Sequence, residues 1–329
     1  MTAGPGPLNV PLLDRLRSAG GAYVPVLELD PDPGRLRRDL DALDAFGFVL
    51  ERHPFHGVAY RGPAPRLCPD QIEWELGTRR IGRRIAVWNR VTSTNDLAAR
   101  AAGSTANDGL VVLAEEQTAG RGRRGRSWSA PPGSSILMSV LLFPPEPLVE
   151  AAWLTALGAV AVAEVVEDLI GEPARIKWPN DVRVRGRKVA GVLVERSSGS
   201  VLGLGVNACA ELEDFPEDLR VTATSLRLLT GATVDRSELA RGLIRRLDAL
   251  YEEGLDRGPG ALNAPWRDRL EPIGQPAVAE TPTGPVAGRL IDADLRDGLT
   301  LATGSGAIRR LRAAEVMALS AAVGGRPPI

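Results

Sequence analysis

The chain has 329 residues, of which 44% are hydrophobic and 25% charged, and its net charge is −1. This size and composition predict a globular protein of two or three domains, and the balanced charge excludes an overall field that draws it to nucleic acid or membranes. No apolar run is long enough to cross a bilayer, and the amino terminus has no charged-then-apolar signal segment. The two cysteines lie far apart without metal-type spacing, which predicts a protein of the reducing cytoplasm.

Residues 1–66 predict a small separate domain. Apolar positions recur at helical spacing over Leu8–Leu16, and a second helix is predicted over Arg35–Ala45. A hairpin follows, with strands predicted at Phe48–Leu50 and Val58–Tyr60. Two helices followed by a hairpin give the outline of a winged helix-turn-helix.

The charge of this domain leaves its role open. Residues 1–66 hold eight arginines and eight acidic residues. Arg35, Arg37 and Arg38 could meet phosphates, but the same helix carries acidic residues, namely Asp39, Asp41 and Asp44. Both a DNA-binding domain and a cap or dimerisation module without DNA contacts agree with this pattern.

Residues 80–268 predict a second, larger domain in which strands and helices alternate. The predicted strands are Ile85–Val91, Leu110–Ala114, Ile136–Phe143, Val182–Val184, Val189–Val194 and Val201–Val206, and the predicted helices are Thr92–Ala102, Ala151–Ile170 and Asp235–Leu255. Hairpin-length connections predominate. They favour an α+β fold with a mixed, mainly antiparallel sheet and helices over a doubly wound parallel sheet.

Residues 272–320 predict a third domain, a small β-barrel. Short alternating strands are separated by glycine-containing turns, and they are predicted at Ala277–Glu280, Val286–Asp292, Leu299–Ala302 and Ala307–Leu311.

The segment Gly120–Arg126, the arginine loop, contains four arginines and three glycines in seven residues. Between Glu116 and Glu146 the chain has no acidic residue. Glycines allow the backbone to approach a ligand closely, while arginines bind carboxylate or phosphate oxygens in pairs. Because like charges repel, we expect the loop to be mobile until an anion orders it. A basic turn and an RNA-binding tract are the alternatives, but the position between two predicted strands favours an active-site loop.

Arginine supplies almost all the positive charge, since Lys177 and Lys188 are the only lysines. Lysine offers a compact charge that often contacts phosphate, which favours a functional role for both over chance. They flank the turn Trp178–Asp181. Asp181 could bind magnesium, accept a proton from an incoming amine, or cap the turn.

Two kinds of active site are excluded. The chain is not a P-loop enzyme, because it has no Gly-x-x-x-x-Gly-Lys-Ser/Thr motif. It has no plausible nucleophile triad, because its only histidines, His53 and His56, lie in the amino-terminal domain. The arginine loop therefore favours charge stabilisation of an in-line displacement at phosphorus. Taken alone, Thr92–Asn95 predicts a helix cap, and Gly203–Asn207 is suited to lie against a flat base.

Five segments resemble, in order and spacing, those of biotin–protein ligases, namely Ser93–Asn95, the arginine loop with Trp128, Lys177–Asp181, Lys188–Glu195 and Gly203–Asn207. The resemblance covers residues 82–320. It implies a class II synthetase-like ligase domain followed by an SH3-like β-barrel, and the amino-terminal domain is similar in outline to the winged helix of bifunctional ligase-repressors. The implied reaction forms biotinyl-AMP from biotin and ATP, and then transfers the biotinyl group to a lysine of a biotin carboxyl carrier protein.

The resemblance also implies residue roles. The catalytic residues would be Lys188, Arg123, Asp181 and Arg121. The biotin site would comprise Ser93, Thr94, Asn95, Gln117, Gly120, Arg121, Gly122, Arg123, Lys188, Gly191 and Leu193. ATP or the adenylate would contact Arg126, Trp128, Lys177, Asn180 and Asn207, with Asn180 and Asp181 as neighbours of Mg²⁺.

Two alternatives stay open. A lipoate or octanoate ligase shares the fold class, although the tandem arginine motif favours biotin. A biotin-responsive repressor, with the ligase domain as its sensor, would bind a DNA operator, but the predicted wing Pro54–Gly57 has no basic residue. The family also leads us to expect a homodimer.

Overall fold

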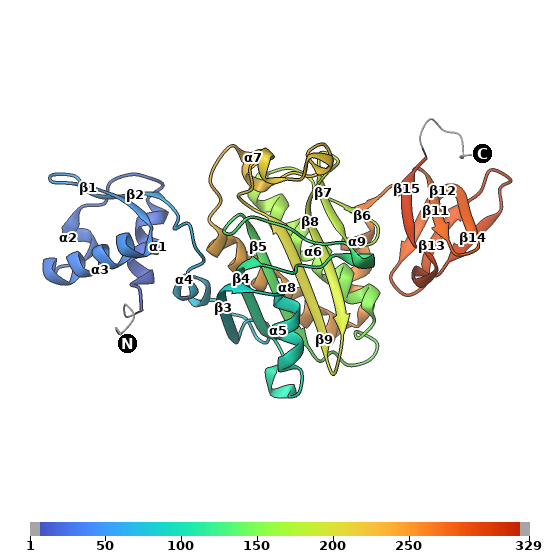
Figure 1. The fold of residues 1–329 in the computed structure, drawn as a ribbon, viewed down its shortest axis with the longest axis horizontal. Helices are drawn as coiled ribbons and strands as arrows, with labels where there is room; N and C mark the ends of the chain where they lie inside the picture. The colour runs from blue at the N-terminus through green and yellow to red at the C-terminus, as the bar shows by residue number, and fades with distance from the viewer. Residues whose placement is uncertain (1–6, 323–329) are drawn as a thin grey trace.

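The computed structural model describes residues 7–322. Three units lie in a row, with a small amino-terminal unit at one end, a large sheet in the middle and a small sheet at the other end (Figure 1). Among the described residues, no helix is both long and apolar enough to cross a membrane.

The amino-terminal unit consists of helices and one hairpin, as predicted. Its elements are α1 (Val10–Ser18), α2 (Val26–Leu29), α3 (Pro33–Phe46), β1 (Val49–His53) and β2 (Gly57–Gly62). The Asp32 side chain accepts hydrogen bonds at the start of α3, and Gly47, with φ of 116°, ends it. Leu13, Leu16 and Leu43 lie fully buried in a hydrophobic cluster of this unit.

The middle unit is built on one eight-stranded sheet in the order β10-β6-β7-β8-β9-β5-β4-β3. Its strands are β3 (Arg84–Val91), β4 (Leu110–Gln117), β5 (Ser135–Leu142), β6 (Arg175–Lys177), β7 (Asp181–Val184), β8 (Arg187–Arg196), β9 (Ser200–Asn207) and β10 (Leu270–Glu271). Only the outermost pairs of this sheet, β10 with β6 and β3 with β4, are parallel. The predicted mixed, mainly antiparallel sheet is therefore confirmed.

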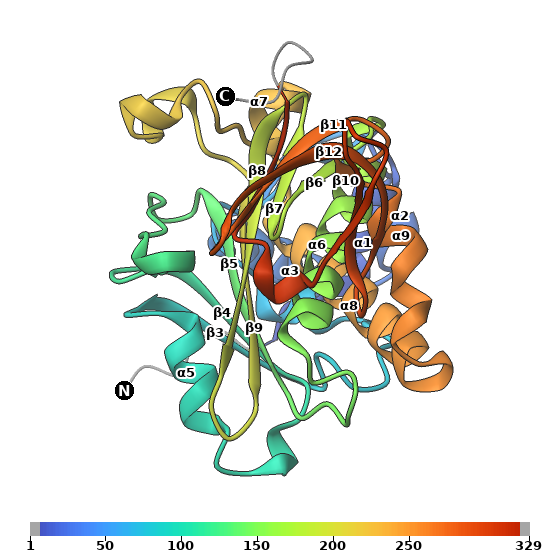
Figure 2. The same cartoon turned by 90° about the vertical axis from the view of Figure 1, so that its right-hand side faces the viewer.

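Helices cover the two faces of the sheet unequally (Figure 2). The long helices α6 (Ala151–Ile170) and α8 (Arg236–Arg257) pack on one face, while the short helix α5 (Thr94–Ala101) packs on the other. Gly158 lets α6 approach closely, because a Cβ there would lie 2.9 Å from the Val192 side chain of β8. The remaining helices are α4 (Pro69–Glu73), α7 (Leu226–Thr230) and α9 (Asn263–Arg267).

The carboxy-terminal unit is an antiparallel five-stranded sheet in the order β14-β13-β12-β11-β15. Its strands are β11 (Pro276–Thr281), β12 (Gly284–Asp294), β13 (Gly298–Ala302), β14 (Ile308–Leu311) and β15 (Ala318–Ala321). The strand β15 was not predicted, because Ala-Leu-Ser-Ala contains no β-branched or aromatic residue. A hydrogen bond from Trp178 Nε1 to the Val316 carbonyl, 3.1 Å long, joins this unit to the middle one.

Candidate active site

The site lies on the sheet face opposite α6, where β8 and β9 carry small residues. Gly191 pairs with Gly205, and Leu193 pairs with Gly203. The indole of Trp128 packs on this surface, because a Cβ at Gly205 would lie 2.6 Å from its Cε2 atom. The sequence led us to expect a flat group against these glycines. In this structure the flat group is Trp128.

Lys188 and Asp181 meet beside this surface. The hairpin between β7 and β8 turns at Arg185-Gly186, both with positive φ, and brings Lys188 Nζ to 2.7 Å from Asp181 Oδ1. The same ammonium lies 5.4 Å from the centre of the Trp128 ring. The compact lysine head therefore sits between a carboxylate and an aromatic face.

Two cations of the arginine loop remain available to an anion. Within residues 7–322, neither Arg123 nor Arg126 forms an ion pair. Burial and the neighbouring charge of Arg124 lower the pKa of Arg123, although a guanidinium stays charged in proteins. The charge of the Asp181 carboxylate acts on the pKa of Arg123 in the opposite direction.

The loop is closed by its own backbone and touches the carboxy-terminal unit. Trp128 N–H donates to the Gly120 carbonyl at 2.9 Å, and Gly122 N–H donates to the Arg126 carbonyl at 2.7 Å. Arg124, with φ of 56°, donates from Nη2 to the Met317 carbonyl at 2.6 Å. The arginine loop therefore lies next to the segment that precedes β15.

Arg121 differs from its neighbours, because two carboxylates neutralise it. Its guanidinium lies 2.7 Å from Asp96 Oδ1, and Glu195 holds it through both carboxylate oxygens at 3.1 and 2.9 Å. The hydrogen bonds with Arg121 lower the pKa of Glu195 and of Asp96, and raise that of Arg121. The local sequence has no acid to compensate Arg121, and in the structure the compensating acids come from distant segments.

The start of α5 also differs from the expectation. The helix begins at Thr94, and the Ser93 hydroxyl at its N-cap position makes no capping hydrogen bond. Gln117 Oε1 instead accepts from the Thr94 backbone N–H at 2.7 Å and from its hydroxyl at 2.9 Å. The hydroxyl cap favoured from the sequence is replaced by a side chain from the end of β4.

Asn95, the next residue of α5, is buried. Its Nδ2 donates to Glu195 Oε2 at 2.6 Å, and its Oδ1 lies 2.6 Å from the Ser139 hydroxyl oxygen. A Cβ at Gly203 would collide with Asn95 Oδ1, so the glycine makes room for this amide.

Three further predicted site residues flank the Asp181 turn or the end of β9. Asn180 Nδ2 donates to the Val192 carbonyl at 2.8 Å, and Asn207 Nδ2 donates to the Thr224 carbonyl at 3.0 Å. Lys177 pairs with Asp181 across β6 and β7. Both amide side chains therefore hold backbone segments at the border of the site.

Sequence reasoning missed three residues of this site, which are Asp96, Ser139 and Glu195. Two signals were present, since Glu195 ends one of the segments that carry the family resemblance and Asp96 adjoins Asn95. Ser139 was a polar residue within a predicted buried strand, and it is fully buried. A buried hydroxyl needs a hydrogen-bond partner, which could have marked it.

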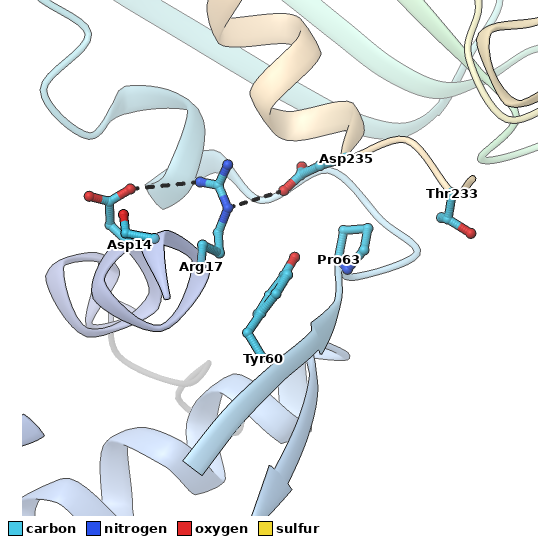
Figure 3. Close-up of a pocket in the computed structure, with 7 residues that line it drawn as sticks. Asp14, Arg17, Tyr60, Pro63, Thr233 and Asp235 are labelled. Carbon is cyan, nitrogen blue, oxygen red and sulfur yellow. Dashed lines mark ion pairs between the residues drawn. The ribbon is translucent and has the colours of Figure 1, made fainter. Parts of the chain in front are cut away.

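A cavity elsewhere contains none of the predicted site residues. It lies between the amino-terminal and middle units (Figure 3) and is lined by Asp14, Arg17, Ser18, Tyr60, Pro63, Thr233 and Asp235. Arg17, its one basic residue, pairs with Glu238 at 2.9 Å and lies 3.8 Å from Asp235. Its charge is therefore already compensated, and the cavity is a junction between units.

The chain is similar to known biotin ligases along most of its length. The model of the Biotin/lipoate A/B protein ligase family matches residues 87–209. The biotin–[acetyl-CoA-carboxylase] ligase of Mycobacterium tuberculosis is 39% identical over 251 residues, which cover 73% of this chain and 92% of that protein. The bifunctional ligase/repressor BirA of Bacillus subtilis is 28% identical over 319 residues, 94% of this chain and 98% of that protein.

The fold is also similar to that of a solved ligase. The Aquifex aeolicus biotin protein ligase, solved in complex with biotin and ATP, superposes with a TM-score of 0.65 and 26% identity. The match covers 73% of this chain and all of that one.

Proposed function

Because this chain belongs to the biotin–protein ligase family, we propose that it activates biotin with ATP and transfers the biotinyl group to a lysine of a biotin carboxyl carrier protein. The observation that supports this most is the cationic site on the glycine surface of β8 and β9. There Lys188 pairs with Asp181 beside the Trp128 ring, and the charge of Asp181 also acts on Arg123 of the arginine loop. Such a site suits an anion attached to a flat group.

In the first step, an oxygen of the biotin carboxylate attacks the α-phosphorus of ATP. A bond from carboxylate oxygen to phosphorus forms, the bond to the bridging oxygen breaks, and pyrophosphate leaves with the electron pair. Lys188 and Arg123 would neutralise the negative charge on the reacting groups, and Arg126 would face the leaving pyrophosphate. Held cations need no reorganisation during the reaction, which is why they lower its barrier.

In the second step, the amine of the carrier lysine attacks the carbonyl carbon of biotinyl-AMP. The new amide bond forms, AMP leaves, and the amine loses one proton. Asp181 is the carboxylate we propose to accept that proton, because it lies within the site and is partly exposed. The arginine loop would cover the mixed anhydride and keep water from it between the steps.

For the biotin ring we propose the pocket end formed by Ser93, Thr94 and Gln117, whose buried or half-buried polar atoms match the polar ureido group. Gly191 and Leu193 would line the pocket, and Trp128 would contact the adenine. Asn207 and Lys177 would border the nucleotide.

Magnesium would enter the site together with ATP. This ion usually takes one or two protein carboxylates together with substrate phosphates. Asp181 fits that pattern, since its carboxylate pairs with Lys188, a cation that also attracts phosphate, and the side-chain oxygen Oδ1 of Asn180 is the second candidate ligand. When bound, the ion would neutralise phosphate charge.

We propose three domains. Residues 1–66 would form a winged helix-turn-helix, supported by the order of helices and hairpin and by a hydrophobic cluster of its own. Residues 80–268 would form the class II synthetase-like catalytic domain, and residues 272–320 an SH3-like barrel, supported by the five antiparallel strands.

Operator binding is the second candidate function, favoured by the near full-length similarity to the Bacillus bifunctional ligase/repressor. The charges on the winged unit oppose strong binding. Arg35 pairs with Asp30 at 2.6 Å, and Arg52 pairs with Asp41 and Asp44. Each pair would have to break before its arginine could meet a phosphate.

Product analysis tests the main proposal. The protein is incubated with biotin and ATP labelled at the α-phosphate, and biotinyl-AMP is sought by chromatography. An apo carrier domain is then added, and its mass should rise by one biotinyl group while labelled AMP appears. Absence of the adenylate would reject the proposal, and a gel-shift assay with biotinyl-AMP would test operator binding separately.

A further inference from the structure

We propose that Glu195 is a positioning residue that anchors the arginine loop through Arg121, and that Ser139 and Asn95 connect this anchor to Thr94 in the proposed biotin pocket. The inference rests on the proposed function and deepens it. It assigns a task to Glu195 and Ser139, to which the reaction gives no role, and a second task to Asn95. It also explains why one arginine of the loop is turned toward carboxylates.

The anchor is a planar, two-point contact. Arg121 donates from Nε and Nη2 to the two oxygens of Glu195, at 3.1 and 2.9 Å, and from Nη2 to Asp96 at 2.7 Å. Such forked contacts fix direction as well as distance. Arg121 is the first arginine of the loop and follows the end of β4 by four residues, so the anchor fixes the start of the loop. Arg123 and Arg126 follow it after two and five residues.

A chain of short contacts runs from the anchor to the pocket. Asn95 Nδ2 donates to Glu195 Oε2, so its Oδ1 faces Ser139 Oγ at 2.6 Å. Ser139 Oγ lies 2.7 Å from Thr94 Oγ1, which lies 2.9 Å from Gln117 Oε1. The orientation of Gln117 is fixed as well, because its oxygen accepts from the Thr94 backbone N–H.

The contacts between oxygen atoms in this chain outnumber the hydroxyl hydrogens that can bridge them. Three oxygen–oxygen contacts join Thr94 to Gln117, Thr94 to Ser139 and Ser139 to Asn95, but only the two hydroxyls supply hydrogens, since amide oxygens only accept. If Thr94 donates to Gln117, Ser139 must supply the hydrogen for Thr94, and Asn95 Oδ1 receives none. A ligand that bonds to Thr94 or Gln117 therefore changes whether Asn95 Oδ1 receives a hydrogen bond from Ser139.

Burial makes this arrangement matter. Ser139 is 0% exposed, Thr94 3% and Asn95 5%. Water cannot readily replace a missing hydrogen bond there, so the contact without a hydrogen carries a cost. Occupation of the ring end of the pocket would thus stabilise Asn95, then Glu195, then Arg121.

A double-mutant cycle tests the anchor. Glu195→Gln, Arg121→Ala and the double variant are compared by the rate at which trypsin cleaves the loop and by the rate of adenylate release. Glu195→Gln should accelerate both by roughly five- to tenfold, the size expected for a partly exposed charged pair. In the Arg121→Ala background it should add nothing, because Glu195 acts through Arg121.

The matched control is Glu172→Gln, which breaks the two-point pair of Glu172 with Arg185 outside the site. Its loop cleavage should equal that of the wild type. Two results would overturn the anchor. One is that Glu195→Gln accelerates loop cleavage equally with Arg121 and with alanine in its place, and the other is that Glu195→Gln is cleaved at the wild-type rate. Thermal unfolding of each variant separates this result from a folding defect.

The connection to the pocket is tested with Ser139→Ala. Without biotin, its loop should be cleaved at close to the wild-type rate, because the Arg121–Glu195 pair is intact. Biotin should slow cleavage in the wild type and protect the variant less. Undiminished protection in Ser139→Ala would reject the connection.

Cleavage without biotin tests the anchor independently of substrate identity. A wild-type protein that forms no biotinyl-AMP would instead reject the proposed function, so the two failures are distinguishable.

Discussion

At the scale of single residues, the site depends on glycines that let the side chains of Lys188 and Trp128 pack directly on the sheet. A Cβ at Gly191 would lie 3.1 Å from Lys188 Nζ and 3.3 Å from the Trp128 ring. Lysine fits this space because its charge is compact, whereas a guanidinium is broad and planar. The rarity of lysine in the chain, noted from the sequence, thus has a steric counterpart in the structure.

Lys188→Arg should lose about a hundredfold in kcat/KM for adenylate formation, because the charge is kept but displaced from its place beside Asp181. Steady-state ATP–pyrophosphate exchange measures this. Arg187→Lys, next to it on β8, is the matched control and should stay close to the wild type. Near wild-type exchange by Lys188→Arg would show that the compact ammonium is not needed.

Gly205→Ala should raise the KM for ATP by about tenfold with a smaller change in the KM for biotin. The added methyl group would meet Trp128 Cε2 at 2.6 Å and push the indole from the glycine surface. Initial-rate kinetics with each substrate varied in turn distinguish the two constants. An unchanged KM for ATP would show that the position of Trp128 does not contribute to nucleotide binding.

At the scale of elements, periodicity predicted most of the fold but not the partners of the side chains. The helix α6 has the predicted bounds, Ala151–Ile170, because it is a long apolar run ended by Gly171. The strand β15 and the short helices lack such a pattern. The Arg121–Glu195 contact spans 74 residues and depends on the registration of β8 with β9, which local patterns do not encode.

The arginine loop is the element that should hold the intermediate. Arg123→Gly should leave adenylate formation within a few-fold of the wild type but release biotinyl-AMP at least about tenfold faster, since a charged contact to the phosphate is lost. Rapid filtration after one round of synthesis measures release, and the exchange rate of the same sample is the internal control. Retention equal to that of the wild type would argue against a clamp.

At the scale of the whole molecule, an ion pair of the middle unit holds residues 65–67, the linker that follows the amino-terminal unit. Arg236, at the start of α8, pairs with Glu115 of β4 at 2.7 Å and donates to the Pro65 carbonyl of the linker at 2.6 Å. Glu115 also accepts from the Leu67 backbone N–H. Because Glu115 lies two residues before Gln117, the linker from the amino-terminal unit is attached to the strand that leads into the site.

Arg236→Met should lower the free energy of unfolding by about 3 kcal/mol, because it removes the buried guanidinium and leaves the Glu115 carboxylate, 14% exposed, without its charged partner. Arg90→Met is the control, since Arg90 pairs with the adjacent Glu116 but is largely exposed, and it should cost less than about 1 kcal/mol. Urea denaturation measures both. Equal losses would mean that the linker contact contributes no more than a surface pair.

The central claim, adenylation of biotin at the site of Lys188 and the arginine loop, is tested most directly by ATP–pyrophosphate exchange with different acids. The wild-type protein is assayed with biotin, lipoate, octanoate or no acid, at equal concentrations. The account predicts exchange that depends on biotin and stays at background with the other acids. Exchange driven equally by lipoate or octanoate, or exchange without any acid, would contradict it.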